Sequence, residues 1–121
     1  MTYNKDIKSN RAQNRFDQFL LKLASEPYEK HVQIDSFYIK INQLWTTSDD
    51  NYKIFLLNKL RPYQETRGLW LEYLKWAEEG LTIFRQREQK TQQATLLNNM
   101  GVMADGLHDR EKALHYYEQS L

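Results

Sequence analysis

The chain has no cysteine, and it contains only four glycines and two prolines in 121 residues. Without cysteine it can have no disulfide, no thiolate nucleophile and no cysteine-ligated zinc. Its charges nearly cancel, with 17 Lys and Arg against 16 Asp and Glu, so it has no strong overall field for nucleic acid or anionic membranes. No apolar run is long enough for a membrane-spanning helix, and positions 1–15 hold no signal-peptide core. These absences predict a soluble, cytoplasmic protein without a membrane partner.

Good helix formers dominate what is present, chiefly Gln, Glu, Leu, Lys and Ala. Apolar residues recur at helical spacing between short polar segments, which predicts an all-α fold of about six helices in three antiparallel pairs. We expect a flexible polar tail at 1–9 and a single domain at 10–121, whose residues 10–50 form the first helical pair. The expected helices cover residues 11–24, 28–45, 51–66, 69–87, 91–105 and 110–121.

Helix-capping and helix-breaking residues predict where the later helices begin and end. Pro62 lies inside the helix at 51–66 and removes one backbone donor, so we expect a kink or a weak middle there. One of residues 48–50 should cap that helix, and Gly68 should adopt the left-handed conformation after it. Gly106 is expected to close the fifth helix, and Asp109 to cap the sixth.

The chain also resembles itself when it is shifted so that residue 54 falls on residue 94. Residues 54–81 then align with 94–121, and one helix–turn–helix segment maps onto another. The matches fall at packing positions rather than at random. Five positions are identical, namely Leu57/Leu97, Asn58/Asn98, Leu74/Leu114, Glu78/Glu118 and Leu81/Leu121.

These residues resemble the tetratricopeptide repeat, whose pattern places small residues where two helices touch. The copy at 91–121 matches the pattern with Leu97, Met100-Gly101, Ala113 and Tyr117. The copy at 51–87 is degenerate, because Arg61 replaces the Gly and Tyr73 the Ala. The resemblance covers residues 54–121 and implies a right-handed superhelical array of helical pairs.

The length of this period resembles the long-helix repeats of kinesin light chains and of bacterial NB-ARC (STAND) signalling ATPases. Residues 15–45 are loosely similar to the helical region that precedes repeats in those ATPases. No GxxxxGK[ST] P-loop occurs in the chain. The resemblance therefore implies the sensor or regulatory part of a signalling protein, without its nucleotide-hydrolysing domain.

In the tetratricopeptide family, the first helix of each repeat faces a groove that holds peptides or partner helices. Asn amides suit such a groove, because they donate and accept hydrogen bonds at once. Asn98 and Asn99 are equally explained as repeat residues that set helix geometry, and both readings stay open. Val102 stands where a carboxylate clamp needs an Asn, so we do not expect a receptor for C-terminal tails. The implied groove residues are Asn58, Pro62, Glu65, Thr95, Asn98, Asn99, Val102 and Asp105.

The final helix presents apolar side chains that no later helix covers. Leu114, Tyr117 and Leu121 are the expected members of this open end. Exposed apolar area of a few hundred Å² is typical of an interface. We therefore predict self-association through this helix.

Other residue clusters were weighed for chemistry. His108 and His115 could be imagined as metal ligands, but solvated positions near a helix start explain them. Adjacent carboxylates at 49–50 and 78–79 point in different directions and suit capping and solvation. No triad or nucleophile elbow occurs. The sequence therefore predicts no enzyme, no metal and no cofactor.

Two further clusters leave an alternative open. Trp70, Tyr73 and Trp76 with Tyr63 could form a stacking platform for bases, or they could pack between repeat helices. The segment at 5–15 has four basic residues and one acidic residue. The leading prediction is a protein–protein interaction scaffold. The alternative is a nucleic-acid-associated, transcription-regulatory helical domain that uses this basic segment.

Overall fold

The computed structural model describes Arg15, Gln18 and residues 31–121, and every regular element within residues 31–121 is a helix. The chain divides into two compact units, residues 1–39 and 40–121. The all-α prediction is confirmed for these described residues, which hold five helices of ten or more residues instead of six. The expected tail at 1–9 and nearly all of the helix at 11–24 lie outside them. The elements are α2 (His31–Asp35), α3 (Tyr38–Thr47), α4 (Asp50–Thr66), α5 (Trp70–Gln86), α6 (Lys90–Gly106) and α7 (Arg110–Ser120).

The prediction of one continuous helix at 28–45 is wrong. Over residues 31–47 the chain forms α2 and α3, with a break at Ser36 and Phe37. There the amide of Phe37 donates to the carbonyl of Ile34 at 2.9 Å, which closes a turn. Asp35 and Ser36 favour such a break, because their short polar side chains compete with the helical backbone bonds.

The helices α4 to α7 begin at regular intervals along the chain, and we call this spacing their shared frame. Three of them contain 17 residues each, and three-residue turns join them, so they begin at residues 50, 70, 90 and 110. Every turn has one residue with a positive φ, namely Gly68 (70°), Glu88 (55°) and His108 (58°). In every turn the third residue donates its N–H to the carbonyl five residues earlier, as in a Schellman motif. These bonds are Leu69 to Gln64 at 2.8 Å, Gln89 to Phe84 at 2.9 Å and Asp109 to Ala104 at 3.0 Å.

These turns confirm some of the predictions about helix caps and helix ends, and they correct another. Gly68 takes the left-handed conformation as expected. Asp49 accepts from the N–H of Tyr52 at 2.8 Å, and Asp109 caps α7 by accepting from the N–H of Lys112 at 3.1 Å. Gly106 does not close α6, because it is the last helical residue and His108 takes the left-handed position.

Pro62 does not interrupt α4, which continues to Thr66. The expected weak middle is therefore not a break in the helix. Pro62 has no N–H, so the carbonyl of Asn58 lacks its usual helical donor.

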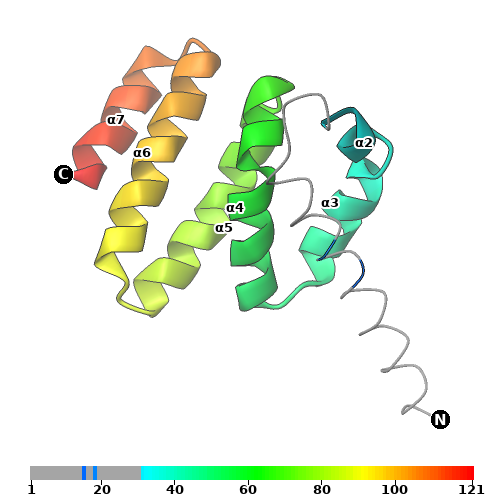
Figure 1. The fold of residues 1–121 in the computed structure, drawn as a ribbon. Coiled ribbons are helices and arrows are strands. Elements are labelled where there is room, and N and C mark those ends of the chain that lie inside the picture. Colours follow the sequence, from blue (N-terminus) through cyan, green and yellow to red (C-terminus); the bar gives the residue numbers. More distant parts are fainter. Residues whose placement is uncertain (1–14, 16–17, 19–30) are drawn as a thin grey trace. The chain divides into compact units, whose positions relative to one another are not determined.

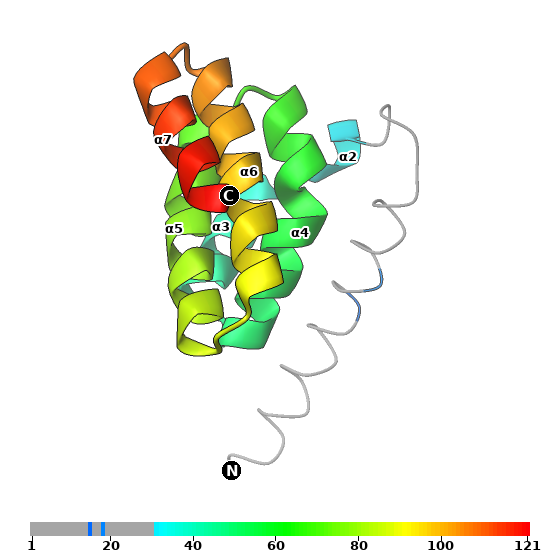
Figure 2. The ribbon, with the colours of Figure 1, turned by 90° about the vertical axis from the view of Figure 1, so that its left-hand side faces the viewer.

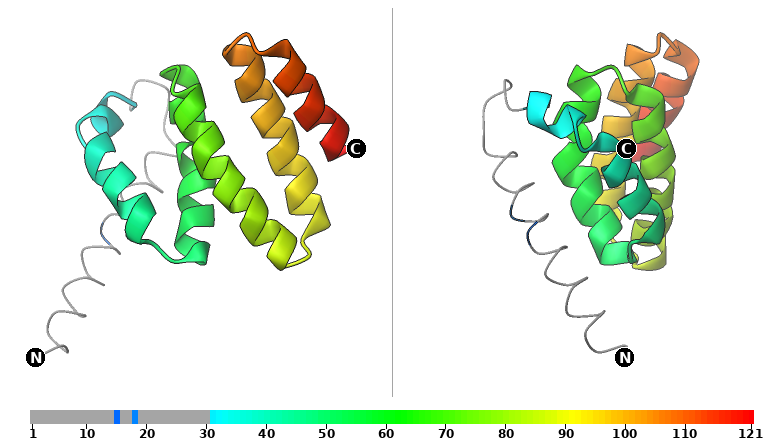
Figure 3. Two further views of the ribbon diagram at one scale, coloured as in Figure 1. Left: turned by 180° about the vertical axis from the view of Figure 1, so that it is seen from behind. Right: turned by 90° about the vertical axis from the view of Figure 1, so that its right-hand side faces the viewer.

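The helices α4 to α7 form two layers, with α5 and α7 in one and α4 and α6 in the other (Figures 1 and 2). Figure 3 shows the same arrangement from behind, with α5 in front of α4. Gly80 of α5 lies where three helices meet. A Cβ there would approach Leu57 Cδ2 of α4 to 2.7 Å and Leu96 Cδ2 of α6 to 3.4 Å. The most deeply buried side chains include Leu56, Leu57, Leu60, Tyr73, Ala77, Met100, Met103, Ala104 and Ala113.

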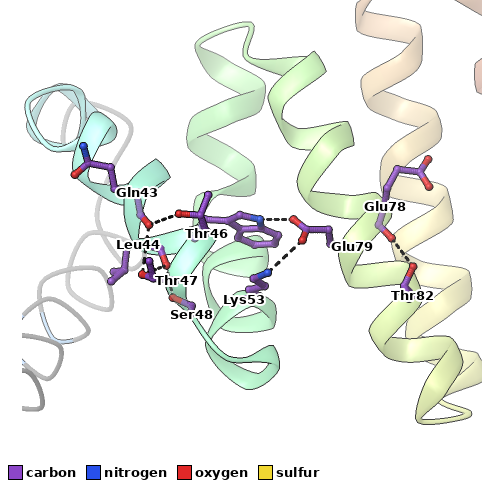
Figure 4. A network of polar contacts seen from close by, with 10 residues as sticks. Gln43, Leu44, Thr46, Thr47, Ser48, Lys53, Glu78, Glu79 and Thr82 are labelled. Atoms are coloured by element: carbon purple, nitrogen blue, oxygen red, sulfur yellow. Dashed lines mark hydrogen bonds and ion pairs between the residues drawn. The ribbon is translucent and has the colours of Figure 1, made fainter. Parts of the chain in front are cut away.

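Trp45 attaches α3 to α4 and α5. Its indole stacks on that of Trp76, with the ring centroids 4.4 Å apart and the planes 3° from parallel. Its N–H donates to Glu79, which also accepts from Lys53 at 3.1 Å (Figure 4). Lys53 lies 5.6 Å from the centre of the Trp45 ring. The carbonyl of Gln43 near the end of α3 accepts from the hydroxyl of Thr46 at 2.7 Å (Figure 4).

The proposed aromatic stacking platform is wrong. The side chains of Tyr63, Tyr73 and Trp76 are only 3%, 1% and 5% exposed. These rings are packed between helices, so they have no faces free for bases to stack on.

Candidate functional site

Three of the predicted groove residues lie together in one pocket. Asn58 of α4 and Thr95 and Asn99 of α6 line a cavity of about 190 Å³. We call it the α4–α6 pocket. Its remaining lining residues are Phe84 from α5 and Thr91, Gln92 and Leu96 from α6.

Three other predicted groove residues are exposed on the same two helices without lining this pocket. Pro62 lies one turn beyond Asn58 on α4. Asn98 and Val102 continue along α6 from Thr95. The structure thus places the predicted residues on two neighbouring helices, but it brings only three of them into one cavity.

The two predicted acidic groove residues are engaged elsewhere. Glu65 lies 3.2 Å from Arg61, one turn earlier on α4. Asp105 accepts from the hydroxyl of Tyr117 at 3.1 Å and from the guanidinium of Arg110 at 3.0 Å. Glu65 is therefore paired within its own helix, Asp105 joins α6 to α7, and neither carboxylate lines the α4–α6 pocket.

Tyr73, which the sequence offered either as a stacking residue or as a packing residue, is buried, and Asn99 of the pocket influences its pKa. Burial raises the pKa of Tyr73 to about 12, against the opposing effects of Arg61 and of Asn99. The phenol is therefore neutral at ordinary pH. The signal in the sequence was the replacement of the expected small residue by Tyr at position 73.

The three residues predicted to form the open end of α7 differ in exposure. Leu114 is 45% exposed and Leu121 is fully exposed. Tyr117 instead lies over Gly101, where an added Cβ would be 2.5 Å from its ring. Tyr116 is buried and donates to Glu78 at 3.0 Å. Self-association through this helix stays a prediction.

An open depression of about 570 Å³ runs along the outer side of α7. Most of its lining side chains are charged or titratable, in contrast to the α4–α6 pocket. They are Asp109, Glu111, Lys112, Leu114, His115 and Glu118.

Two classes of site find no support in the part of the chain that the structure describes. Over those residues no group of three or more His, Asp or Glu is placed to hold a metal ion. None of the helices found there is long and apolar enough to cross a membrane. The basic segment at 5–15, on which the nucleic-acid alternative depends, lies outside the described residues except for Arg15.

Comparison with protein-family models, curated proteins and solved structures gives no significant match to this chain. The resemblance to tetratricopeptide repeats therefore rests on the residues quoted above and stays a prediction.

Proposed function

We propose that this chain is a protein–protein interaction scaffold of the tetratricopeptide-repeat type, with repeats at 51–87 and 91–121. The frame of α4 to α7 supports the repeat, because α4 and α6 have equal lengths and begin at the equivalent positions Asp50 and Lys90. The resemblance of residues 15–45 to signalling ATPases extends the proposal to a regulatory part of a larger signalling protein.

One observation carries the binding function. Asn58 from the first helix of one pair and Thr95 and Asn99 from the first helix of the next line a single cavity. These side chains can pair with either polar group of a peptide backbone. A scaffold that binds an extended segment of its partner needs such a surface across two helical pairs.

The proposal is tested by selecting binders from a displayed random-peptide library on the intact chain. The selected peptides should bind Asn58→Ala and Asn99→Ala about fivefold more weakly, the loss expected for one hydrogen bond of about 1 kcal/mol. Isothermal titration calorimetry with synthetic copies of the peptides measures the change. Asn98→Ala tests whether the exposed neighbour contributes.

Asn42→Ala is the matched control, because Asn42 lies in α3 and outside the pocket. Its affinity for the peptides should equal that of the unmodified chain. Peptides that bind all of these variants equally well would show that the binding surface lies elsewhere, and a library without binders would count against the scaffold itself.

A further inference from the structure

The outer side of α7 carries acidic and apolar side chains in alternation. Glu111, Leu114 and Glu118 follow one another at intervals of three and four residues, so they lie along one side of the helix. Leu121, the C-cap residue, continues the row at the next interval of three. All four side chains are exposed, and the first three line the open depression of about 570 Å³. We call these four residues the α7 seam, because their spacing is that of a contact between two helices.

The equivalent row on α5 is covered by a helix. Leu74, which is equivalent to Leu114, is only 3% exposed, against 45% for Leu114. Glu78, one turn further along α5, accepts from the hydroxyl of Tyr116 in α7 at 3.0 Å. A helix therefore lies along this row where the molecule supplies one, and the α7 seam has the same spacing.

Charge distinguishes the depression on α7 from the corresponding surface of α5. The positions of Leu69 and Leu71 at the start of α5 are taken at the start of α7 by Asp109 and Glu111. The lining of the depression thus has three carboxylates against one ammonium, that of Lys112. The acidic excess is local, since the net charge of the whole chain is +1. The occupant of the α7 seam should therefore be basic.

The two glutamates of the seam are available to a partner. Within residues 31–121, neither Glu111 nor Glu118 forms an ion pair. Lys112, the one lysine of the lining, lies 6.0 Å from the centre of the Tyr116 ring. Opposite charge across an interface selects the partner and fixes its register, even where each exposed ion pair contributes little affinity.

A second copy of the chain is the wrong occupant for this seam. The predicted self-association through α7 would bring two identical seams together about a two-fold axis. Glu111 and Glu118 of both copies would then share one interface, and like charges in an interface oppose binding. A helix with basic residues at the same spacing meets the two glutamates favourably.

We propose that the α7 seam docks an amphipathic helix of a partner protein, whose contact row alternates basic and apolar residues at heptad spacing. The basic residues pair with Glu111 and Glu118, and the apolar residues cover Leu114 and Leu121. The seam and the α4–α6 pocket have no lining residue in common. This inference therefore adds a second binding surface and does not depend on the proposed peptide binding.

The test measures the binding of three labelled helical peptides to the intact chain by fluorescence anisotropy. The first consists of three copies of the heptad Lys-Ala-Ala-Leu-Ala-Gln-Ala, which places Lys and Leu on one side of a helix. The second has Glu in place of Lys. The third repeats Lys-Ala-Leu-Ala-Ala-Gln-Ala, which has the same composition but places Leu opposite Lys. The first peptide should bind at least about tenfold more tightly than either of the others.

Variants of the chain locate the binding. Leu114→Ala should weaken the first peptide about tenfold, because it removes apolar surface that the peptide covers. The double variant Glu111→Gln with Glu118→Gln should weaken it about fivefold and reduce its dependence on salt. These positions are exposed in the unbound chain, so the variants should keep the circular dichroism spectrum of the unmodified chain. Leu71→Ala and Glu88→Gln are the matched controls, because both residues are exposed outside the depression, and they should leave the binding unchanged.

The remaining outcomes overturn the proposal in different ways. Equal binding of the first and third peptides would mean that positive charge alone is recognised, without a helical seam. No binding of the first peptide, or full binding by Leu114→Ala, would place the partner surface elsewhere. Light scattering of the chain alone should give the same mass for the unmodified chain and Leu114→Ala, and a dimer that Leu114→Ala dissociates would assign the seam to a second copy. Loss of the library peptides in Asn58→Ala or Asn99→Ala concerns the α4–α6 pocket alone, so the two proposals fail separately.

Discussion

The α4–α5 and α6–α7 pairs begin at equivalent positions, but they place a large and a small residue on opposite helices. At equivalent positions of the first helix, one pair has Arg61 and the other Gly101. At equivalent positions of the second helix, the first pair has the buried Ala77 and the other has Tyr117, which lies over Gly101. A large residue accompanies a small one in both pairs, but the two helices exchange these roles.

The same exchange affects the acidic residue at the end of the first helix. Glu65 is paired with Arg61 from its own helix, whereas the equivalent Asp105 accepts from Tyr117 of the facing helix. The carboxylate therefore keeps a partner in both pairs. In the first pair this contact stays within α4, whereas in the second it joins α6 to α7.

The largest expected effect comes from giving the second pair the large residue of the first pair while Tyr117 is still in place. Gly101→Arg places atoms where the ring of Tyr117 lies and should lower the free energy of unfolding by about 3 kcal/mol, as for overpacking. Urea unfolding followed by circular dichroism measures the loss.

Completing the exchange should recover part of that loss. The double variant Gly101→Arg with Tyr117→Ala reproduces the Arg61 and Ala77 combination and should be about 1–2 kcal/mol more stable than Gly101→Arg alone. Tyr117→Ala alone provides the third corner of the cycle. Strict additivity of the two changes would contradict the interpretation that the positions compensate each other.

A second contrast concerns Tyr73, whose equivalent is Ala113. Burial raises the pKa of Tyr73 from 10.0 to about 12 in the folded chain. Its stabilising contribution is therefore complete below pH 10 and is lost as the pH rises through 12, because the unfolded chain ionises first. Tyr73→Phe should abolish this part of the alkaline loss, which is on the order of 2 kcal/mol.

Unfolding curves at several pH values between 9 and about 12 test this expectation, since the lysines of both proteins titrate alike and cancel in the difference. An equal alkaline loss in both proteins would mean that Tyr73 ionises as freely as in the unfolded chain.

The smallest expected effects come from the three turns. Glu88→Gly and His108→Gly should each raise stability by about 0.5–1 kcal/mol, because they relieve a positive φ at a residue with a side chain. Gly68→Ala should lower it by a similar amount for the opposite reason. Shifts in the melting temperature measure all three. Opposite signs at positions 88 and 108 would show that the turns differ in spite of their shared bonds.

The later helices could be predicted because their signals are local. Helical spacing of apolar residues and caps such as Asp49 and Asp109 suffice to place α4 to α7 within a few residues. The left-handed residue after α6 could not, because the choice depends on packing. A Cβ at Gly106 would come within 2.9 Å of the ring of Trp70, so that glycine leaves room for Trp70 and His108 takes the turn.

The candidate site was predictable only as a set of helix positions. In the alignment of the two repeat copies Asn58 is equivalent to Asn98, but the pocket is lined by Asn58 and Asn99. Which residues of α4 and α6 line the pocket depends on how the helices rotate against each other, and no local pattern reports that rotation. The same holds for Asp105, which the repeat positions assign to the groove and which Tyr117 binds instead.

The regular spacing of α4 to α7 also bears on which insertions and deletions the fold can accept. The helices begin at Asp50, Trp70, Lys90 and Arg110, so every unit of one helix and its turn has the same length. Duplication or loss of one whole helical pair joins a turn to a helix it already fits, whereas a one-residue insertion inside a helix rotates the later side chains of that helix by about 100° relative to the earlier ones. Changes of length in steps of one helical pair would therefore keep the spacing of the remaining helices and turns.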